Sequence, residues 1–190
     1  KAIRRSGAKV GDEIWVSGSI GDARLALAAL RHEINLPKED LQRVEHRMHQ
    51  PSPRVELGMQ LRDVASAALD VSDGLLGDLR HILMQSQVDA QVDLDKLPKS
   101  SALQKQDIST QKLFAACGGD DYELCFTAHP SQREKIQAIS KSLNLPITLI
   151  GKILPREGIE AKIHLLDASG DKLSDKEMAP FLKSFDHFAS

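Results

Sequence analysis

The sequence has few of the features that mark nucleic-acid-binding or membrane proteins. Only 4% of its 190 residues are aromatic and the formal net charge is -2, so neither a base-stacking surface nor a basic patch is expected. The longest apolar-rich run, residues 23–30, is far too short to span a bilayer and contains Arg24. We therefore expect no nucleic-acid partner and no membrane segment.

Cysteine is also scarce, with Cys117 and Cys125 as the only two, on either side of a Gly-Gly pair. A disulfide between them is one interpretation, but buried thiols in a cytoplasmic protein fit so few cysteines better. The first residues contain no apolar segment of the kind found in secretory signals. The sequence starts with Lys and not with Met, which is compatible with a processed, tagged or truncated chain, so we do not assume that it is complete.

Strand-like and helix-like patterns alternate along the chain. Strands are predicted at 13–17, 67–71, 88–94, 122–127, 147–153 and 161–166. Helices are predicted at 23–32, 41–48, 54–65, 74–85 and 131–143, the last with Ser131 and Glu134 as a capping box. Residues 95–110 predict a short helix with loops, and 176–188 a helical or irregular end. The alternation predicts one α/β domain over residues 1–190, with helices packed on a layered, mixed β-sheet.

One acidic motif lies where a predicted strand becomes a helix, and it contains Asp70, Ser72 and Asp73. A helix cap explains part of it, because Ser72 or Asp73 can accept backbone N–H groups and contribute about 1 kcal/mol. It does not explain Asp70, which falls within an apolar strand, where an unpaired carboxylate is costly. A hard cation such as Mg²⁺ prefers carboxylate oxygens. Spacing alone leaves both interpretations open, and Asp78 is expected on the helix surface.

A second acidic motif, Gly118-Gly-Asp-Asp-Tyr-Glu123, precedes a predicted strand. Its glycines allow close approach of a ligand, although a tight turn with solvated acids explains this segment when it is taken alone. Two acidic glycine corners in one chain can converge on one metal-bridged site. The segment Gly18-Ser-Ile-Gly21 suits phosphate binding at a helix N-terminus, but an ordinary turn fits it better.

Five sequence blocks, taken in order, resemble thiamine-monophosphate kinases. They are Arg5–Asp12, Val16–Gly21, Asp70–Leu75, Gly118–Leu124 and Phe185–Phe188. The resemblance runs over essentially the whole chain, but only to the C-terminal part of that family. It implies the C-terminal domain fold of the superfamily that includes aminoimidazole ribonucleotide synthetase. It also implies an enzyme that uses ATP and Mg²⁺ to phosphorylate thiamine monophosphate to thiamine diphosphate.

The resemblance assigns metal and nucleotide roles to individual residues. Asp70 and Asp73 match Mg²⁺ ligands, and Ser72 matches a nucleotide contact. Arg5 matches an ATP-contacting arginine, with Arg4 as the alternative if the alignment shifts by one residue. The family also forms homodimers through an N-terminal domain that supplies further metal-binding acids. That domain is absent from these residues, so we expect this chain alone to be inactive or nearly so.

The resemblance also assigns the substrate side of the site. Asp120, with Asp121 beside it, matches a position that binds thiamine monophosphate, and Phe185 matches an aromatic substrate contact. No His or Cys is a candidate for a covalent carrier, so we expect direct in-line phosphoryl transfer with no catalytic side chain beyond positioning and charge neutralisation. Two alternatives remain, a related kinase or synthetase with another phosphoryl acceptor, and a non-catalytic binding or dimerisation module.

Overall fold

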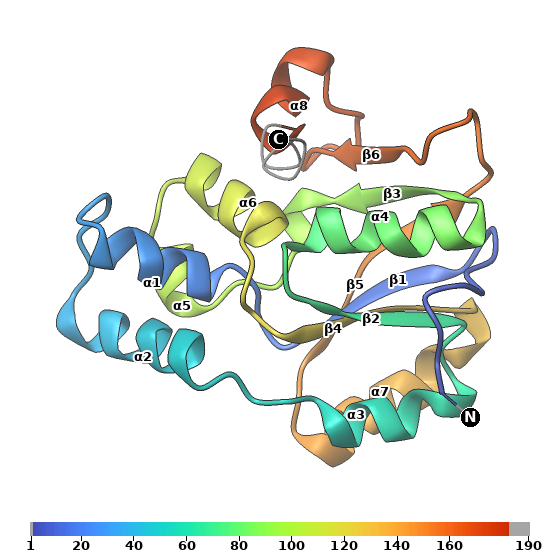
Figure 1. Cartoon of the computed structure of the whole chain (residues 1–190), viewed down its shortest axis with the longest axis horizontal. Helices are drawn as coiled ribbons and strands as arrows, with labels where there is room; N and C mark the ends of the chain where they lie inside the picture. The colour runs from blue at the N-terminus through green and yellow to red at the C-terminus, as the bar shows by residue number, and fades with distance from the viewer. Residues whose placement is uncertain (1, 183–190) are drawn as a thin grey trace.

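A computed structural model of the chain describes residues 2–182, which are built around one six-stranded sheet (Figure 1). The strand order is β2-β4-β1-β5-β3-β6. The strands are β1 (Glu13–Ser17), β2 (Ala67–Val71), β3 (Asp89–Asp93), β4 (Glu123–Ala128), β5 (Ile147–Leu154) and β6 (Ile163–Leu166). Neighbouring strands are antiparallel except β3 and β6, which are parallel. The predicted mixed sheet is confirmed.

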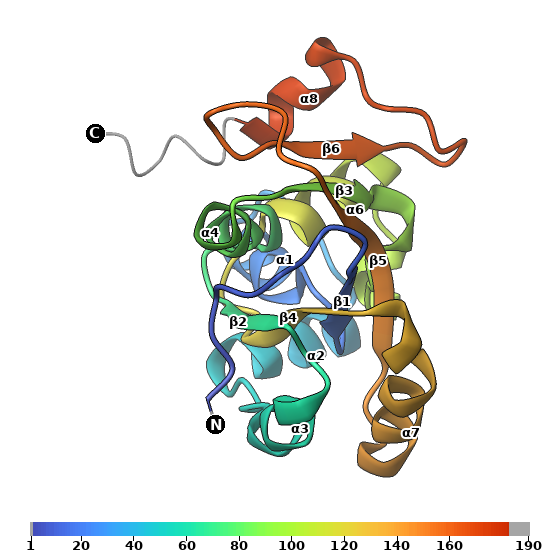
Figure 2. The same cartoon turned by 90° about the vertical axis from the view of Figure 1, so that its right-hand side faces the viewer.

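Helices cover both faces of this sheet. The α-helices are α1 (Asp22–Leu30), α2 (Lys38–His49), α3 (Val55–Gln60), α4 (Leu75–Ser86), α5 (Ser101–Gln104), α6 (Ile108–Cys117), α7 (Arg133–Leu143) and α8 (Asp175–Leu182). Three short 3₁₀ helices are η1 (Leu61–Asp63), η2 (Leu94–Lys96) and η3 (Pro130–Gln132). Helices α1, α4 and α6 lie on one side of the sheet, and α3 and α7 lie on the other (Figure 2).

Strand β1 shows why the sequence folds in this way. It is central and buried along its whole length, and its side chains alternate between the two faces. Ile14 and Val16 join the larger apolar cluster, which contains residues of α1, α4 and α6. Trp15 points to the smaller cluster, where it meets Leu57 of α3 and Ile136 of α7. Two separate cores therefore fix the position and register of the strand.

Two details of the predicted helices are wrong. Helix α6 was not predicted, because its apolar residues are consecutive at Leu113–Ala116 and do not recur at helical spacing. The predicted capping box of Ser131 and Glu134 is absent, because α7 begins at Arg133 and no side chain caps it. Instead, Pro130 starts a 3₁₀ turn whose Ser131 N–H donates to His129 Nδ1 at 3.2 Å.

Two expectations from composition can be compared with the structure. Cys117 and Cys125 are not joined to each other by a disulfide, and Cys125 is fully buried. Burial raises the pKa of the Cys125 thiol to about 12. Within residues 2–182, no helix has the length and apolar character needed to cross a membrane.

Candidate functional site

The two acidic motifs lie side by side. We call residues 70–74, between β2 and α4, the first acidic corner, and residues 118–123, between α6 and β4, the second acidic corner. The Asp120 N–H donates to the Ser72 carbonyl at 2.8 Å, and the Tyr122 N–H donates to the Val71 carbonyl at 2.9 Å. The expected convergence of the two corners is therefore present, although the motifs are almost fifty residues apart in sequence.

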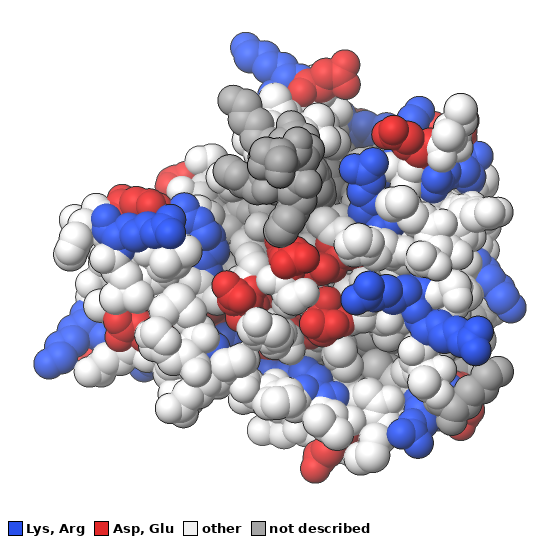
Figure 3. Space-filling model, in the orientation of Figure 1, with Lys and Arg blue, Asp and Glu red and all other residues white. Residues whose placement is uncertain are grey.

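Three carboxylates of these corners, those of Asp70, Asp73 and Asp120, are exposed. Among the described residues, the side-chain carboxylates of Asp70 and Asp73 have no hydrogen-bond or ion-pair partner, while Asp120 Oδ1 accepts a long bond of 3.4 Å from the Tyr122 hydroxyl. The charge of Asp120 raises the pKa of the Tyr122 phenol, and Asp70 and Asp73 add to that effect. Figure 3 shows acidic side chains near the middle of this face, where β2 ends and α4 begins in Figure 1.

The exposure of Asp70 corrects one step of the sequence argument. Asp70 is not a buried carboxylate in an apolar strand, because β2 is the edge strand of the sheet and pairs only with β4. Burial alternates along β2, and Asp70 lies on the less buried face of the strand, exposed where β2 meets the first acidic corner. A pairing cation is thus not needed to offset burial. The case for a cation rests instead on charges that no neighbouring group neutralises.

Asp78 has a different place from the one predicted. It is buried, not on the helix surface, and its Oδ2 accepts the Ser72 N–H at 2.8 Å and the Asp73 N–H at 2.9 Å. Helix α4 begins after Gly74 without a side-chain cap, so the interpretation of Ser72 or Asp73 as the cap is wrong. Burial raises the pKa of Asp78, and the charges of Asp73 and Asp70 raise it further. Asp78 therefore holds the backbone of the first acidic corner in place through hydrogen bonds to its N–H groups.

Asp120 and Asp121 are consecutive but lie in opposite environments. Asp121 is only 6% exposed, and its carboxylate accepts the N–H groups of Gly21 at 2.6 Å and Ala23 at 3.4 Å. Burial raises the pKa of Asp121 to about 7, against the lowering effect of these bonds. The N-terminus of α1 thus receives an internal carboxylate, which argues against the interpretation of Gly18–Gly21 as a phosphate loop.

Glu123 forms a buried polar network that the sequence reasoning did not identify. The carboxylate accepts bonds from Ser17 Oγ at 2.6 Å, from Arg54 Nε at 2.7 Å and Nη2 at 2.5 Å, and from Arg47 Nη2 at 3.1 Å. A side chain on Gly18 would collide with this carboxylate. Exposed Asp120 and Tyr122 alternate here with buried Asp121 and Glu123, a difference that the residue types of the motif do not show.

The remaining predicted site residues are not brought to these corners. Arg4 and Arg5 are exposed beside the edge strand, where the Arg4 carbonyl accepts the Ala68 N–H at 3.1 Å. The Arg5 carbonyl accepts a long bond of 3.4 Å from the hydroxyl of Ser86, at the far end of α4 from the corner. No hydrogen bond or ion pair joins either arginine to the acidic corners. Phe185 lies outside the described residues.

The acids of the corners fit a divalent cation in part. No group of three His, Cys, Asp or Glu side chains within residues 2–182 is arranged to hold a metal. Mg²⁺, however, commonly binds through one or two carboxylates, with water and substrate phosphates as its other ligands. Asp70 and Asp73 are exposed oxygen donors with no competing partner, so they suit such an incomplete site.

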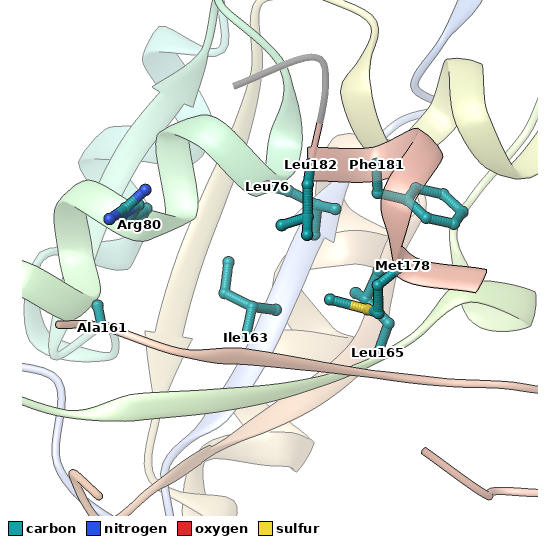
Figure 4. A pocket seen from close by; sticks show the side chains of 8 residues that line it. All are labelled: Leu76, Arg80, Ala161, Ile163, Leu165, Met178, Phe181 and Leu182. Atoms are coloured by element: carbon teal, nitrogen blue, oxygen red, sulfur yellow. The ribbon is translucent and has the colours of Figure 1, made fainter. Parts of the chain in front are cut away.

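A separate hollow lies between α4, β6 and α8 (Figure 4). Figure 4 shows Leu76, Ile163 and Leu182 around it, and Arg80 is the only charged residue among the described residues that line it. These residues include no carboxylate and no hydroxyl, so they offer neither metal ligands nor hydroxyl groups that could orient a phosphate. The acidic corners are the better candidate for chemistry.

Comparison with known families agrees with this choice. Residues 9–164 match the family described as AIR synthase related protein, C-terminal domain. A thiamine-monophosphate kinase of Haemophilus influenzae is 39% identical over 189 residues, which is 99% of this chain and 56% of the relative. One of Salmonella typhimurium is 43% identical over 155 residues, which is 80% of this chain and 48% of the relative. The chain thus spans about half the length of the curated relatives it matches.

Solved structures show the same similarity in three dimensions. A thiamine-monophosphate kinase from Stenotrophomonas maltophilia superposes with a TM-score of 0.78 and 44% identity, over 85% of this chain and 52% of that chain. A structure described as AaThiL complexed with AMPPCP and TMP superposes with a TM-score of 0.72 and 28% identity, over 90% of this chain and 52% of that chain. Escherichia coli HypE, at 19% identity and a TM-score of 0.67, shares the fold.

Proposed function

Because the chain belongs to the AIR synthase related family through its C-terminal domain, and it is similar to thiamine-monophosphate kinases over most of its length, we propose that it is the C-terminal part of such a kinase. The reaction is the ATP-dependent phosphorylation of thiamine monophosphate to thiamine diphosphate. The observation that carries this proposal is the meeting of the two acidic corners, which places three exposed carboxylates on one face. The resemblance assigned roles to these same three acids.

The first acidic corner serves the cation and the nucleotide. Asp70 and Asp73 would hold Mg²⁺, and Ser72, half-buried between them, would contact the nucleotide. The ion would supply charge neutralisation where the phosphates of two anionic substrates meet. Asp78 keeps Ser72 and Asp73 in place through their N–H groups. Arg5 would reach ATP from the edge of β2, where its backbone carbonyl accepts a hydrogen bond from the Ser86 hydroxyl.

The second acidic corner serves the phosphoryl acceptor. Asp120 is the acid that faces solvent there, so we assign the contact with thiamine monophosphate to Asp120 and not to Asp121. Phe185 is the proposed aromatic contact. Phosphoryl transfer requires the two substrates to be aligned more than it requires covalent catalysis. We therefore propose direct in-line transfer, in which the residues of this chain bind and orient the substrates.

The rest of the active site would come from the other half of the protein. The metal ligands of residues 2–182 are incomplete, and the relatives are about twice as long as the matched region. We propose that an N-terminal domain supplies further acids and the contacts of a homodimer. A cytoplasmic location is part of the same proposal.

Thermal unfolding of the chain with and without Mg²⁺ tests the metal assignment. A cation present at tenfold its Kd stabilises the folded state by about 1.4 kcal/mol, which raises Tm by about 3–6 °C. We expect this shift in the parent chain and its loss in Asp70→Asn and Asp73→Asn. Asp63→Asn, which removes an exposed acid of η1, is the matched control and should keep the shift. An equal shift in all four proteins would contradict the assignment.

A further inference from the structure

Asp121 links the second acidic corner to the first turn of α1. Its carboxylate is buried and accepts the Gly21 N–H at 2.6 Å, a short bond, with the Ala23 N–H at 3.4 Å as a weaker partner. Gly21 has φ of 90°, and a Cβ there would lie 2.8 Å from the Phe114 carbonyl carbon. Only glycine can therefore bring its N–H to this position without displacing α6.

The backbone on both sides of Asp121 is strained. Asp120 has φ of 64° and Tyr122 has φ of 51°, both in the left-handed region, which is unfavourable for residues other than glycine and most of all for bulky ones. Such a conformation persists only where surrounding contacts hold it. Two backbone bonds to Ser72 and Val71 hold the corner on the side of β2. On the side of α1, the side chain of Asp121 holds it.

The consecutive acids Asp120 and Asp121 therefore have different roles. We propose that Asp121 is a positioning residue, which fixes the strained corner on α1 so that the neighbouring Asp120 faces the phosphoryl acceptor. The inference rests on the proposed function, because it takes Asp120 as the substrate contact. Without the Asp121 carboxylate, the corner would relax from its left-handed conformation and Asp120 would move. Misplacing a substrate contact by about 1 Å can cost about a hundredfold in rate.

Steady-state kinetics of the full-length protein test the inference. We expect Asp121→Ala to raise the KM for thiamine monophosphate about tenfold or more, or to lower kcat to a similar extent, while the KM for ATP changes less than about twofold. Asp121→Asn keeps an acceptor oxygen for the Gly21 N–H and should restore most of the loss.

Asp89→Ala is the matched control for stability. Asp89 is buried like Asp121 and also accepts two backbone N–H groups, from Glu157 and Lys162 at 2.9 Å each, but it belongs to β3, away from both acidic corners. We expect Asp89→Ala to lower Tm as much as Asp121→Ala does and to leave the kinetic constants at 25 °C unchanged.

The possible results separate the inference from the proposed function. If the unmodified full-length protein forms no thiamine diphosphate, the proposed function fails. If it is active but Asp121→Ala leaves both KM values and kcat unchanged, or changes the two KM values equally, the positioning role is wrong. If Asp121→Ala does not fold, Asp121→Asn carries the test, and a rise of about twofold to fivefold in the KM for thiamine monophosphate alone supports the role. No change in that variant, or an equal change for both substrates, contradicts it.

Discussion

Asp120 and Asp121 show how far the role of a residue depends on its side of the backbone. In the second acidic corner, residues 120 and 122 are exposed and residues 121 and 123 are buried. An exposed carboxylate is available to a ligand, whereas the buried one must be satisfied by internal donors. The sequence of the corner shows three acids and a tyrosine, and only their burial in the structure separates the exposed acid from the internal ones.

The raised pKa of Asp121 predicts how the stability of the folded protein changes with pH. Its folded-state pKa of about 7 lies above the value of 3.8 expected for an unfolded chain, so between these values the folded state binds a proton that the unfolded state releases. Its contribution to stability is therefore fully present below pH 4 and is lost as the pH rises through 7. We expect the free energy of unfolding of the parent, relative to that of Asp121→Asn, to fall between pH 4 and pH 8.

Urea unfolding of both proteins across this range measures that difference, because other titrating groups affect the two proteins alike. A difference that does not change with pH would show that Asp121 is ionised with an ordinary pKa in the folded protein.

Individual residues also show which parts of the candidate site could be predicted from the sequence. The spacing of Asp70 and Asp73 at a strand-to-helix corner left a cation site and a helix cap equally open, and only the resemblance favoured the cation. The role of Asp78 could not be predicted, because its helical spacing fits an exposed acid as well as a buried one. Only the path of the backbone shows that its carboxylate accepts the N–H groups of Ser72 and Asp73.

At the scale of elements, Glu123 joins four parts of the fold. It begins β4 and binds Ser17 at the end of β1, Arg47 of α2 and Arg54 at the start of α3. Its side chain is 1% exposed, so the charge is stable there only because these donors surround it. The network fixes the start of β4, directly after the second acidic corner.

Removing the Arg54 side chain, which makes two hydrogen bonds to Glu123, should therefore destabilise the folded state. We expect Arg54→Ala to lower the free energy of unfolding by about 3 kcal/mol, because within residues 2–182 it leaves a buried carboxylate with Arg47 as its only cationic partner. Arg80→Ala, which breaks the exposed pair with Glu160, should cost less than about 1 kcal/mol. Chemical denaturation measures both values. Equal and small losses would mean that the network contributes nothing beyond a surface ion pair.

The elements themselves were predictable to different extents. The ends of all six strands lie within about two residues of the predicted ends. Strands that are buried on one or both faces leave clear apolar runs in the sequence. Helix α6 was missed because its apolar residues are clustered and its start is fixed by the Asp107 side chain, which accepts the Thr110 N–H at 2.9 Å. The strand order was not predicted, since it depends on contacts between segments far apart in sequence.

At the scale of the whole molecule, the sheet brings the two corners together. Strands β2 and β4 are neighbours in the sheet although α4, β3, α5 and α6 separate them in sequence. Their pairing places the end of β2 beside the start of β4, and with them Asp70 and Asp120. The site remains open and lacks a third metal ligand within residues 2–182. We therefore expect the 190-residue chain alone to form little or no thiamine diphosphate.

The most direct test of the central claim is the rate of ATP-dependent thiamine diphosphate formation by the full-length protein and its Asp70→Asn, Asp73→Asn and Asp120→Asn variants. We predict that the unmodified full-length protein is active and requires Mg²⁺. We expect kcat/KM to fall by at least about a hundredfold in each variant, since each would lose a contact at the reacting phosphates or at the phosphoryl acceptor. Asp63→Asn should retain the parent rate. Variants that turn over within about twofold of the parent would show that the two acidic corners are not the active site.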